Sequence, residues 1–126
     1  DDTYNANKDS LCAAIDVLKS YDAFLILCVA DMKELGENSL AIHREVGQYV
    51  NLVNLDLVCS YGNESAVISE AVLGKHFTDK TEMVDFLVPL IENQLQQNKK
   101  VVVLGKGSRS MKMEDVIYSL KDKIKC

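Results

Sequence analysis

A chain of 126 residues can bury one hydrophobic core, and 48% hydrophobic and 26% charged residues with one Pro and six Gly are typical of a globular domain, not of a disordered or fibrous protein. The net charge of −5 argues against nucleic acid as a partner. The longest apolar run, residues 23–30, is far shorter than the roughly 20 residues that cross a bilayer, so we expect no membrane insertion. The chain starts with neither Met nor a signal peptide, and we expect a piece cut from a longer protein.

The first expected element is a helix. Asn7 can cap it, because the apolar residues Leu11, Ile15 and Leu18 follow on one 3.6-residue stripe. Three continuous apolar runs then have the character of strands that are buried on both faces of a sheet. They are residues 24–29, 57–59 and 101–104.

Helical patterns fill the intervals around these strands. They cover residues 39–53, 64–73, 80–95 and 111–124, and residues 76–77 form a further short strand. Asp79 should cap the third of these helices, whereas Pro89 should kink or split it. The alternation of helix and strand predicts an α/β fold, a Rossmann-like three-layer α/β/α sandwich with a mostly parallel sheet, as one domain.

Ligands of open α/β sheets bind where loops leave the carboxyl ends of the strands. The expected loops are residues 31–36, 60–63 and 105–110. In the last one, two glycines let backbone N–H groups approach a ligand, Ser110 can cap the next helix, and Lys106 and Arg109 add positive charge. This combination suits a carboxylate or phosphate, although a glycine-rich turn with solvated basic side chains fits the pattern equally well. No Walker A motif is present in the chain.

Residues 1–7 place two carboxylates, two amides and a phenol ahead of the first helix. Such groups can contact a nucleoside, but a capping loop explains them too. The four cysteines lack the C-x2-4-C spacing of a metal site, so we expect buried free thiols and no metal ligands. His43 and His76 also lack metal spacing and are interpreted as surface side chains.

Four stretches in order resemble the third, carboxyl-terminal domain of the Mur ligases, in the branch that adds D-alanyl-D-alanine. Residues 1–7 resemble its D-D-x-Y-N-A-N-P, and residues 31–36 resemble its D-M-x-E-L-G. Residues 43–47 are similar to its H-x-x-x-G helix, and residues 106–114 to its K-G-S-R-x-x-x-M-E. The resemblance therefore runs along nearly the whole chain.

Two positions depart from that pattern. Lys8 replaces the Pro of the family, which should cost some preorganisation of the first helix. Ala30 replaces a Gly before Asp31, and Ala resists positive φ, so the local turn could differ.

The resemblance implies a bacterial cytoplasmic enzyme of peptidoglycan synthesis that uses ATP and Mg²⁺ to join D-alanyl-D-alanine to UDP-N-acetylmuramoyl-tripeptide. The amino-terminal domain binds the UDP part, and the central domain carries the P-loop and the metal ligands. Both are absent from this chain, so residues 1–126 hold no catalytic or metal-binding residue and are inactive alone. The partners of the chain are then its own two other domains, ATP and the two substrates.

Residue by residue, the resemblance implies two groups of contacts. Asp2, Tyr4, Asn5 and Asn7 contact the ribose and adenine side of ATP. The substrate contacts come from the strand-end loops: Lys106, Ser108 and Arg109 face the D-alanyl-D-alanine carboxylate, and Asp31 is a further substrate-binding residue.

Two other functions remain open on the residues alone. A receiver-type phosphoacceptor domain also has an acidic pair, an Asp at a strand end, here Asp31, and a Lys after the last strand, here Lys106. Its acidic pair follows a strand, however, and no strand precedes Asp1. A non-enzymatic, flavodoxin-like binding module is the other alternative, because fold does not fix function.

Overall fold

The computed structural model describes the backbone of residues 2–124 and the side chains of residues 7–124. Within this range, four strands form one parallel sheet in the order β3-β2-β1-β4. The strands are β1 (Phe24–Ala30), β2 (Leu57–Tyr61), β3 (Lys75–Phe77) and β4 (Val101–Lys106). The predicted mostly parallel sheet is confirmed.

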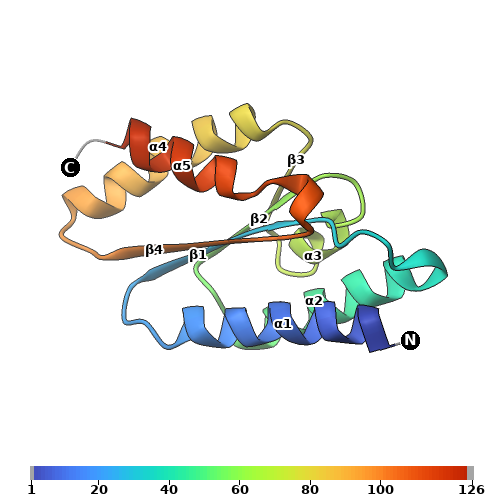
Figure 1. Ribbon diagram of the computed structural model, residues 1–126. Helices are drawn as coiled ribbons and strands as arrows, with labels where there is room; N and C mark the ends of the chain where they lie inside the picture. The colour runs from blue at the N-terminus through green and yellow to red at the C-terminus, as the bar shows by residue number, and fades with distance from the viewer. Residues whose placement is uncertain (1, 125–126) are drawn as a thin grey trace.

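Helices cover both faces of the sheet (Figure 1). On one face lie α1 (Asp2–Lys19), α2 (Ser39–Val53) and α3 (Ala66–Glu70), and on the other lie α4 (Lys80–Gln96) and α5 (Glu114–Lys123). Two short 3₁₀ helices, η1 (Gly36–Asn38) and η2 (Arg109–Met111), occur in the loops after β1 and β4. The three-layer sandwich predicted from the sequence is therefore confirmed.

The central strand β1 explains why the apolar runs are continuous. Leu25, Leu27 and Val29 pack toward α1 and α2, while Ile26 and Cys28 pack toward α4 and α5. The expectation that all three runs are buried on both faces is wrong for β4, whose residues are only half-buried. The reason is its place at the edge of the sheet, where it pairs with β1 alone.

The first helix starts earlier than predicted. It begins at Asp2, so Asn7 lies inside α1 and does not cap it, and residues 2–7 are not a loop. Lys8 gives the physical reason, because its N–H can donate within a helix, whereas the Pro of the related pattern has no N–H and would stop the helix there. The Lys8 ammonium also reaches Glu45 of α2 at 3.4 Å.

The helix α4 is capped as predicted but is not interrupted. The Asp79 carboxylate accepts the N–H of Thr81 at 2.9 Å. The predicted split at Pro89 is wrong, since α4 continues to Gln96. Pro89 and Asp85, four residues earlier, are both exposed, so the hydrogen bond that Pro removes lies on the solvent side of the helix.

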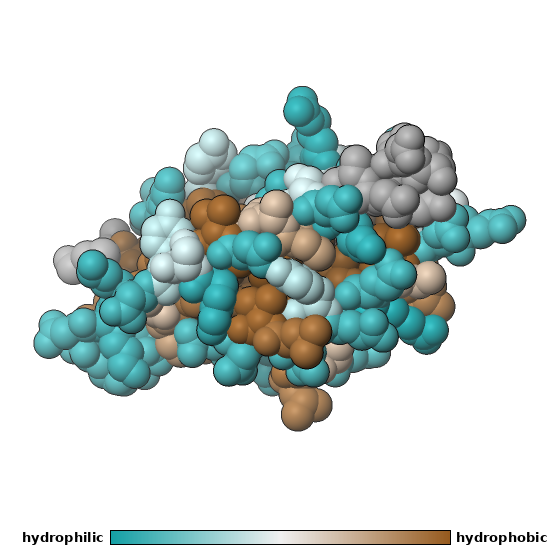
Figure 2. Space-filling model, turned by 90° about the horizontal axis from the view of Figure 1, so that it is seen from below, coloured by the Kyte–Doolittle hydropathy of each residue, from teal (hydrophilic) through white to brown (hydrophobic). Residues whose placement is uncertain are grey.

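The face formed by α1 and α2 is mainly hydrophilic, with scattered apolar groups (Figure 2). Among the described residues, the large exposed apolar side chains of these helices are Val17, Leu40 and Leu52. None of the described helices is long and apolar enough to cross a membrane.

Candidate functional site

The loops after β1 and β4 are hydrogen-bonded to each other at the carboxyl edge of the sheet. The Ser108 N–H donates to the backbone oxygen of Asp31 at 3.1 Å. In return, the Lys33 N–H donates to Ser108 Oγ at 2.6 Å. The Ser108 hydroxyl therefore accepts one hydrogen bond, and among the described residues no acceptor takes its own hydrogen. That hydrogen can be donated to a ligand.

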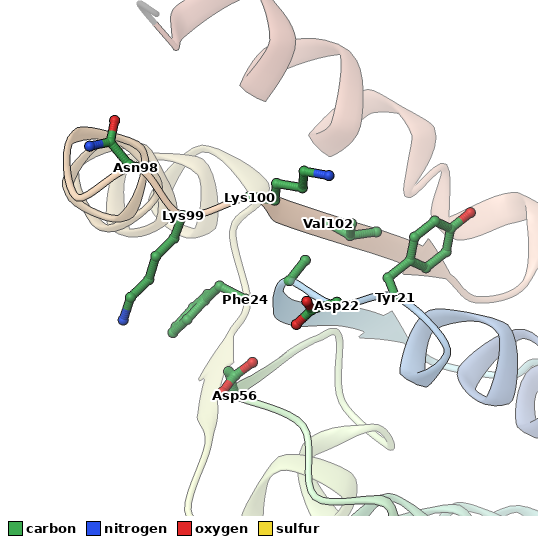
Figure 3. A pocket seen from close by; sticks show the side chains of 9 residues that line it. Tyr21, Asp22, Phe24, Asp56, Asn98, Lys99, Lys100 and Val102 are labelled. Atoms are coloured by element: carbon green, nitrogen blue, oxygen red, sulfur yellow. The ribbon is translucent and has the colours of Figure 1, made fainter.

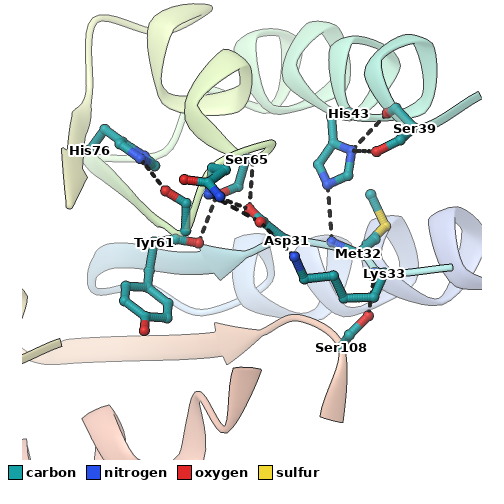
Figure 4. Close-up of polar contacts among 11 residues, drawn as sticks. Asp31, Met32, Lys33, Ser39, His43, Tyr61, Ser65, His76 and Ser108 are labelled. Atoms are coloured by element: carbon teal, nitrogen blue, oxygen red, sulfur yellow. Dashed lines mark hydrogen bonds and ion pairs between the residues drawn. The ribbon is translucent and has the colours of Figure 1, made fainter. Parts of the chain in front are cut away.

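The Asp31 side chain joins the loop after β2 to the same edge (Figure 4). It is 1% exposed, and its Oδ1 accepts the Ser65 N–H at 2.8 Å. Its Oδ2 accepts the Asn63 N–H at 3.0 Å and lies 3.3 Å from the Lys33 ammonium. Gly62 makes this approach possible: its φ is +117°, and a Cβ there would lie 2.6 Å from Asp31 Oδ1. Asp31 thus joins three strand-end loops, because its carboxylate binds the loop after β2 and its backbone oxygen binds the loop after β4.

This environment keeps Asp31 ionised. Burial by itself raises the pKa of a carboxyl group, but the hydrogen bonds from the Asn63 and Ser65 backbone outweigh that effect and lower the pKa of Asp31 from 3.8 to about 2. The bonds also occupy both carboxylate oxygens, which leaves Asp31 poorly placed to accept a phosphoryl group or to contact a substrate directly.

His43 is buried, and its interpretation as a surface residue is wrong. The backbone N–H of Met32 can only donate, so Nε2 of His43 accepts it at 3.0 Å. The ring hydrogen is then on Nδ1, which donates to the backbone oxygen of Ser39 at 2.7 Å. His43 thereby ties the start of α2 to the loop after β1, directly behind Asp31 (Figure 4).

His76 is half-buried and supports the loop after β2. Its Nε2 donates to the backbone oxygen of Gly62 at 2.7 Å, so its Nδ1 accepts the Ser60 hydroxyl at 2.6 Å. Ser60 also contacts the hydroxyl of Ser69 at 2.7 Å. Because Ser60 is fully buried, this Ser–His pair cannot reach a substrate as a nucleophile, and its role is to hold the loop.

The loop after β4 carries the predicted carboxylate-binding residues. Lys106 is half-buried, Arg109 is exposed, and neither side chain has an ion-pair partner among residues 7–124. A small pocket of about 90 Å³ next to them is lined by Asn7, Ser108 and Lys106, together with Ser10, Leu11, Met32 and Gly107. The fold thus brings one predicted nucleotide contact beside two predicted substrate contacts.

Details of this loop differ from the sequence-based expectation. Ser110 lies within η2 and does not cap α5, which begins at Glu114 after Met113. Gly107 serves close packing, since a Cβ there would lie 2.7 Å from that of Ala30. Ala30 itself ends β1 without a positive φ, so it causes no local strain.

Lys33 is the functional candidate that sequence reasoning missed. Its side chain is 42% exposed, and its ammonium lies 3.3 Å from the buried carboxylate of Asp31. The sequence signal that could have identified Lys33 is its position two residues after Asp31, which directly follows β1. The side chains of Asp2, Tyr4 and Asn5 lie outside the described residues, although α1 starts at the same end of the sheet (Figure 1).

A wider cleft of about 590 Å³ lies at the opposite end of the sheet (Figure 3). Tyr21, Phe24, Asp56, Lys99 and Lys100 line it at the amino ends of the strands. Its charges are of both signs, and the strand-end loops do not reach it. We place the candidate site at the carboxyl edge because ligands of open α/β sheets bind there.

The thiols and the acidic residues form no metal centre in the part of the chain that the structure describes. Cys12, Cys28 and Cys59 are free thiols. The prediction that they are buried is right for Cys28 and Cys59 and wrong for Cys12, which is partly exposed. Burial raises the pKa of the Cys59 thiol to about 12 and that of Cys28 further. Cys126 lies outside the described residues.

Comparisons with known proteins agree with this architecture. The chain is 96% identical to UDP-N-acetylmuramoyl-tripeptide--D-alanyl-D-alanine ligase of Haemophilus influenzae, over 100% of the chain and 28% of the relative. A crystal structure of MurF from Acinetobacter baumannii aligns with a TM-score of 0.83 at 29% identity, over 93% of this chain and 26% of that one. The MurF ligase of Thermotoga maritima in complex with ADP, at 24% identity and a TM-score of 0.74, covers 92% of this chain and 26% of that one and shares the fold.

The chain therefore spans about a quarter of the length of these relatives. The family model described as Mur ligase, glutamate ligase domain, matches residues 2–109. This match places the chain outside the receiver-type alternative. The chain belongs to the Mur ligase family.

Proposed function

We propose that this chain is the carboxyl-terminal domain of an ATP-dependent ligase that joins D-alanyl-D-alanine to UDP-N-acetylmuramoyl-tripeptide in bacterial peptidoglycan synthesis. The observation that carries the proposal is the 96% identity, over all 126 residues, to a ligase of that name. The remaining three quarters of such a protein hold the amino-terminal domain for the UDP part and the central domain for the triphosphate and Mg²⁺. The bacterial cytoplasm is the proposed compartment, since ATP is available there.

In the proposed reaction, ATP transfers its γ-phosphoryl group to the terminal carboxylate of the tripeptide and leaves as ADP. The amine of the dipeptide then attacks the acyl phosphate, loses a proton and displaces inorganic phosphate as the amide forms. An acyl phosphate hydrolyses in water, so closure of this domain over the central one serves to exclude water and to orient the amine.

The dipeptide carboxylate is the part that this chain is equipped to hold. Arg109 offers two parallel N–H donors, Lys106 a positive charge, and Ser108 a hydroxyl hydrogen that no described residue accepts. We assign Asp31 a positioning role, because its oxygens are occupied by the backbone of the neighbouring loop. Lys33, held by Asp31, adds a third cation at the same edge.

The nucleotide side of the proposal rests on the start of α1. Asp2, Tyr4, Asn5 and Asn7 are proposed to face the ribose and adenine of ATP when the domain closes. Two observations support this: Asn7 lines the pocket that Lys106 and Ser108 also line, and a structurally similar MurF ligase has been crystallised with ADP.

The test is ligation by the full-length protein. ATP, Mg²⁺, D-alanyl-D-alanine and the UDP-linked tripeptide should yield the amide product together with equal amounts of ADP and phosphate. Residues 1–126 alone should neither hydrolyse ATP nor bind it with micromolar affinity, which requires about 8 kcal/mol of binding free energy. ATP turnover by this chain alone, or a full-length protein that forms no product from these substrates, contradicts the proposal.

A further inference from the structure

The loop after β4 changes direction at Lys112, between η2 and α5. Lys112 has a φ of +50°, in the left-handed region that residues other than Gly seldom adopt. Its N–H donates to the backbone oxygen of Arg109 at 3.1 Å, which closes the turn η2. Its own backbone oxygen accepts the N–H of Asp115 at 3.0 Å, in the first turn of α5. The position of Arg109 relative to α5 therefore depends on the backbone of Lys112.

The side chain of Lys80, the first residue of α4, holds this backbone from another part of the fold. Its ammonium donates to the backbone oxygen of Lys112 at 3.1 Å and lies 3.4 Å from the carboxylate of Asp115. It also lies 5.5 Å from the ring centroid of Tyr61, the last residue of β2. The Lys80 side chain is 25% exposed, so solvent screens these contacts less than those of a fully exposed ion pair.

The turn η2 is thus held at both of its ends. Before the turn, Ser108 is bound to the loop after β1 through its N–H and its hydroxyl. After the turn, Lys80 binds Lys112. Arg109 lies between these two anchors, and its exposed side chain has no ion-pair partner among residues 7–124 that would orient it. The backbone of η2 therefore decides where the guanidinium starts from.

We propose that Lys80 is a positioning residue, which fixes the turn η2 so that Arg109 meets the carboxylate of the incoming dipeptide. Lys80 acts through Lys112 and does not touch the substrate. The inference rests on the proposed function, because it adds to it the group that places the carboxylate-binding side chain. A misplaced guanidinium grips the carboxylate less well. Since that carboxylate lies away from the reacting amine, the loss should be in KM for the dipeptide and not in kcat.

The experiment uses four changes in the full-length protein. Lys80→Met keeps the apolar stem and removes the ammonium, whereas Lys80→Arg keeps a charged donor. Lys75→Met is the matched control, because the Lys75 ammonium also lies over a ring, 5.8 Å from the centroid of Phe86, but has no hydrogen bond with the described residues of the loop after β4. Lys80→Met is also combined with Arg109→Ala. Steady-state kinetics with varied dipeptide gives kcat and KM, and thermal melts check folding.

Lys80→Met should raise KM for the dipeptide by about three- to tenfold, with kcat and the melting temperature close to those of Lys75→Met. Lys80→Arg should recover much of the lost affinity. In the Arg109→Ala background, Lys80→Met should change kcat/KM by less than about twofold, because the side chain that it positions is already gone.

Two results overturn the inference and leave the proposed function intact. One is an unchanged KM in Lys80→Met. The other is an equal loss with and without Arg109, which would show that Lys80 acts independently of that side chain. A parent protein that forms no amide product from the dipeptide and the tripeptide refutes the proposed function itself.

Discussion

Replacing Asp31 with Asn should lower the free energy of unfolding by about 2 to 3 kcal/mol at pH 7, although the two side chains have nearly the same size. The carboxylate uses Oδ1 for the Ser65 N–H and Oδ2 for the Asn63 N–H. A carboxamide has only one acceptor oxygen, so its NH₂ group must face one of these two donors. With oxygen at Oδ1, the carboxamide keeps the Ser65 N–H at 2.8 Å and the longer Asn63 contact at 3.2 Å. Its NH₂ group then replaces the oxygen that accepts the Asn63 N–H at 3.0 Å, and the negative charge that strengthens these bonds is lost.

Two independent considerations give the magnitude. A hydrogen bond to a charged group contributes about 1.5 to 3 kcal/mol, and the 3.0 Å bond between the Asn63 N–H and the charged Oδ2 is the one that is lost. The pKa of Asp31 falls from 3.8 to about 2 on folding. Multiplying this difference of about 1.8 by 1.36 kcal/mol gives an upper value of about 2.4 kcal/mol. The ion pair with the half-exposed Lys33 adds little.

The pH dependence distinguishes this explanation from a general loss of packing. Because folding lowers the pKa of Asp31, its stabilisation is complete above the unfolded value of 3.8 and is lost as the pH falls toward 2. Urea unfolding of the parent and of Asp31→Asn should therefore differ at pH 7, with about two thirds of the carboxylate contribution gone at pH 2.5. The exposed Asp85→Asn serves as the control. A variant within about 0.5 kcal/mol of the parent at pH 7, or a difference independent of pH, refutes the reasoning.

Three further changes test the packing around the site. Gly62→Ala should lower the free energy of unfolding in chemical denaturation by at least about 2 kcal/mol, because its Cβ would meet Asp31. The control Gly36→Ala, at φ +61° but in open space, should lower it by about 1 kcal/mol, and equal losses would show that the contact with Asp31 is unimportant. Gly107→Ala should lower the melting temperature, because its Cβ would meet that of Ala30. Adding Ala30→Gly to this variant should restore much of the lost melting temperature, and a double variant that melts lower than either single variant would contradict this explanation. Cys28 and Cys59 should not react with a thiol reagent at pH 8 until denaturant is added, because burial raises the pKa of both thiols. Mass spectrometry detects the label, and a label on either residue in the native protein contradicts the structure.

The elements of the fold were predictable because their signals are local. Continuous apolar residues in β1, amphipathic stripes in α2 and α4 and the Asp79 cap each act within a few residues, and the structure has these elements where the sequence placed them. The helices predicted over residues 64–73 and 111–124 are shorter, since α3 spans Ala66–Glu70 and α5 begins at Glu114. The location of the site at the carboxyl edge followed from the order of the elements. Errors occurred where one residue changes the local preference, as with Lys8 in place of Pro at the start of α1.

The partners of the polar side chains could not be predicted, because they depend on contacts between distant segments. Asp31 was identified from its position after a strand, but its hydrogen bonds come from Asn63 and Ser65, more than 30 residues away. His43 shows the same limit, since only the packing of α2 places its ring against the N–H of Met32. A sequence pattern gives the chemistry of such groups, while the tertiary fold decides whether they bind a ligand or a backbone.

This distinction makes Arg109 the predicted substrate contact that is best tested by mutation. Unlike Asp31, its side chain is exposed and has no ion-pair partner among the described residues. A guanidinium grips a carboxylate through two parallel hydrogen bonds, and Lys lacks that geometry. Loss of a charged hydrogen-bond partner costs about 1.5 to 3 kcal/mol, so Arg109→Ala should lower kcat/KM for the dipeptide by at least about tenfold in the full-length protein.

Stability should respond differently from activity, and that contrast decides the role of Arg109. Substitutions of exposed side chains usually change the free energy of unfolding by less than about 0.5 kcal/mol, so the melting temperature of Arg109→Ala should match that of the parent. Arg109→Lys keeps the charge without the paired donors and should recover only part of the lost kcat/KM. Steady-state kinetics with varied dipeptide and thermal melts provide the two measurements. Full activity of Arg109→Ala, or a fall in melting temperature as large as the fall in activity, would show that Arg109 does not bind the substrate.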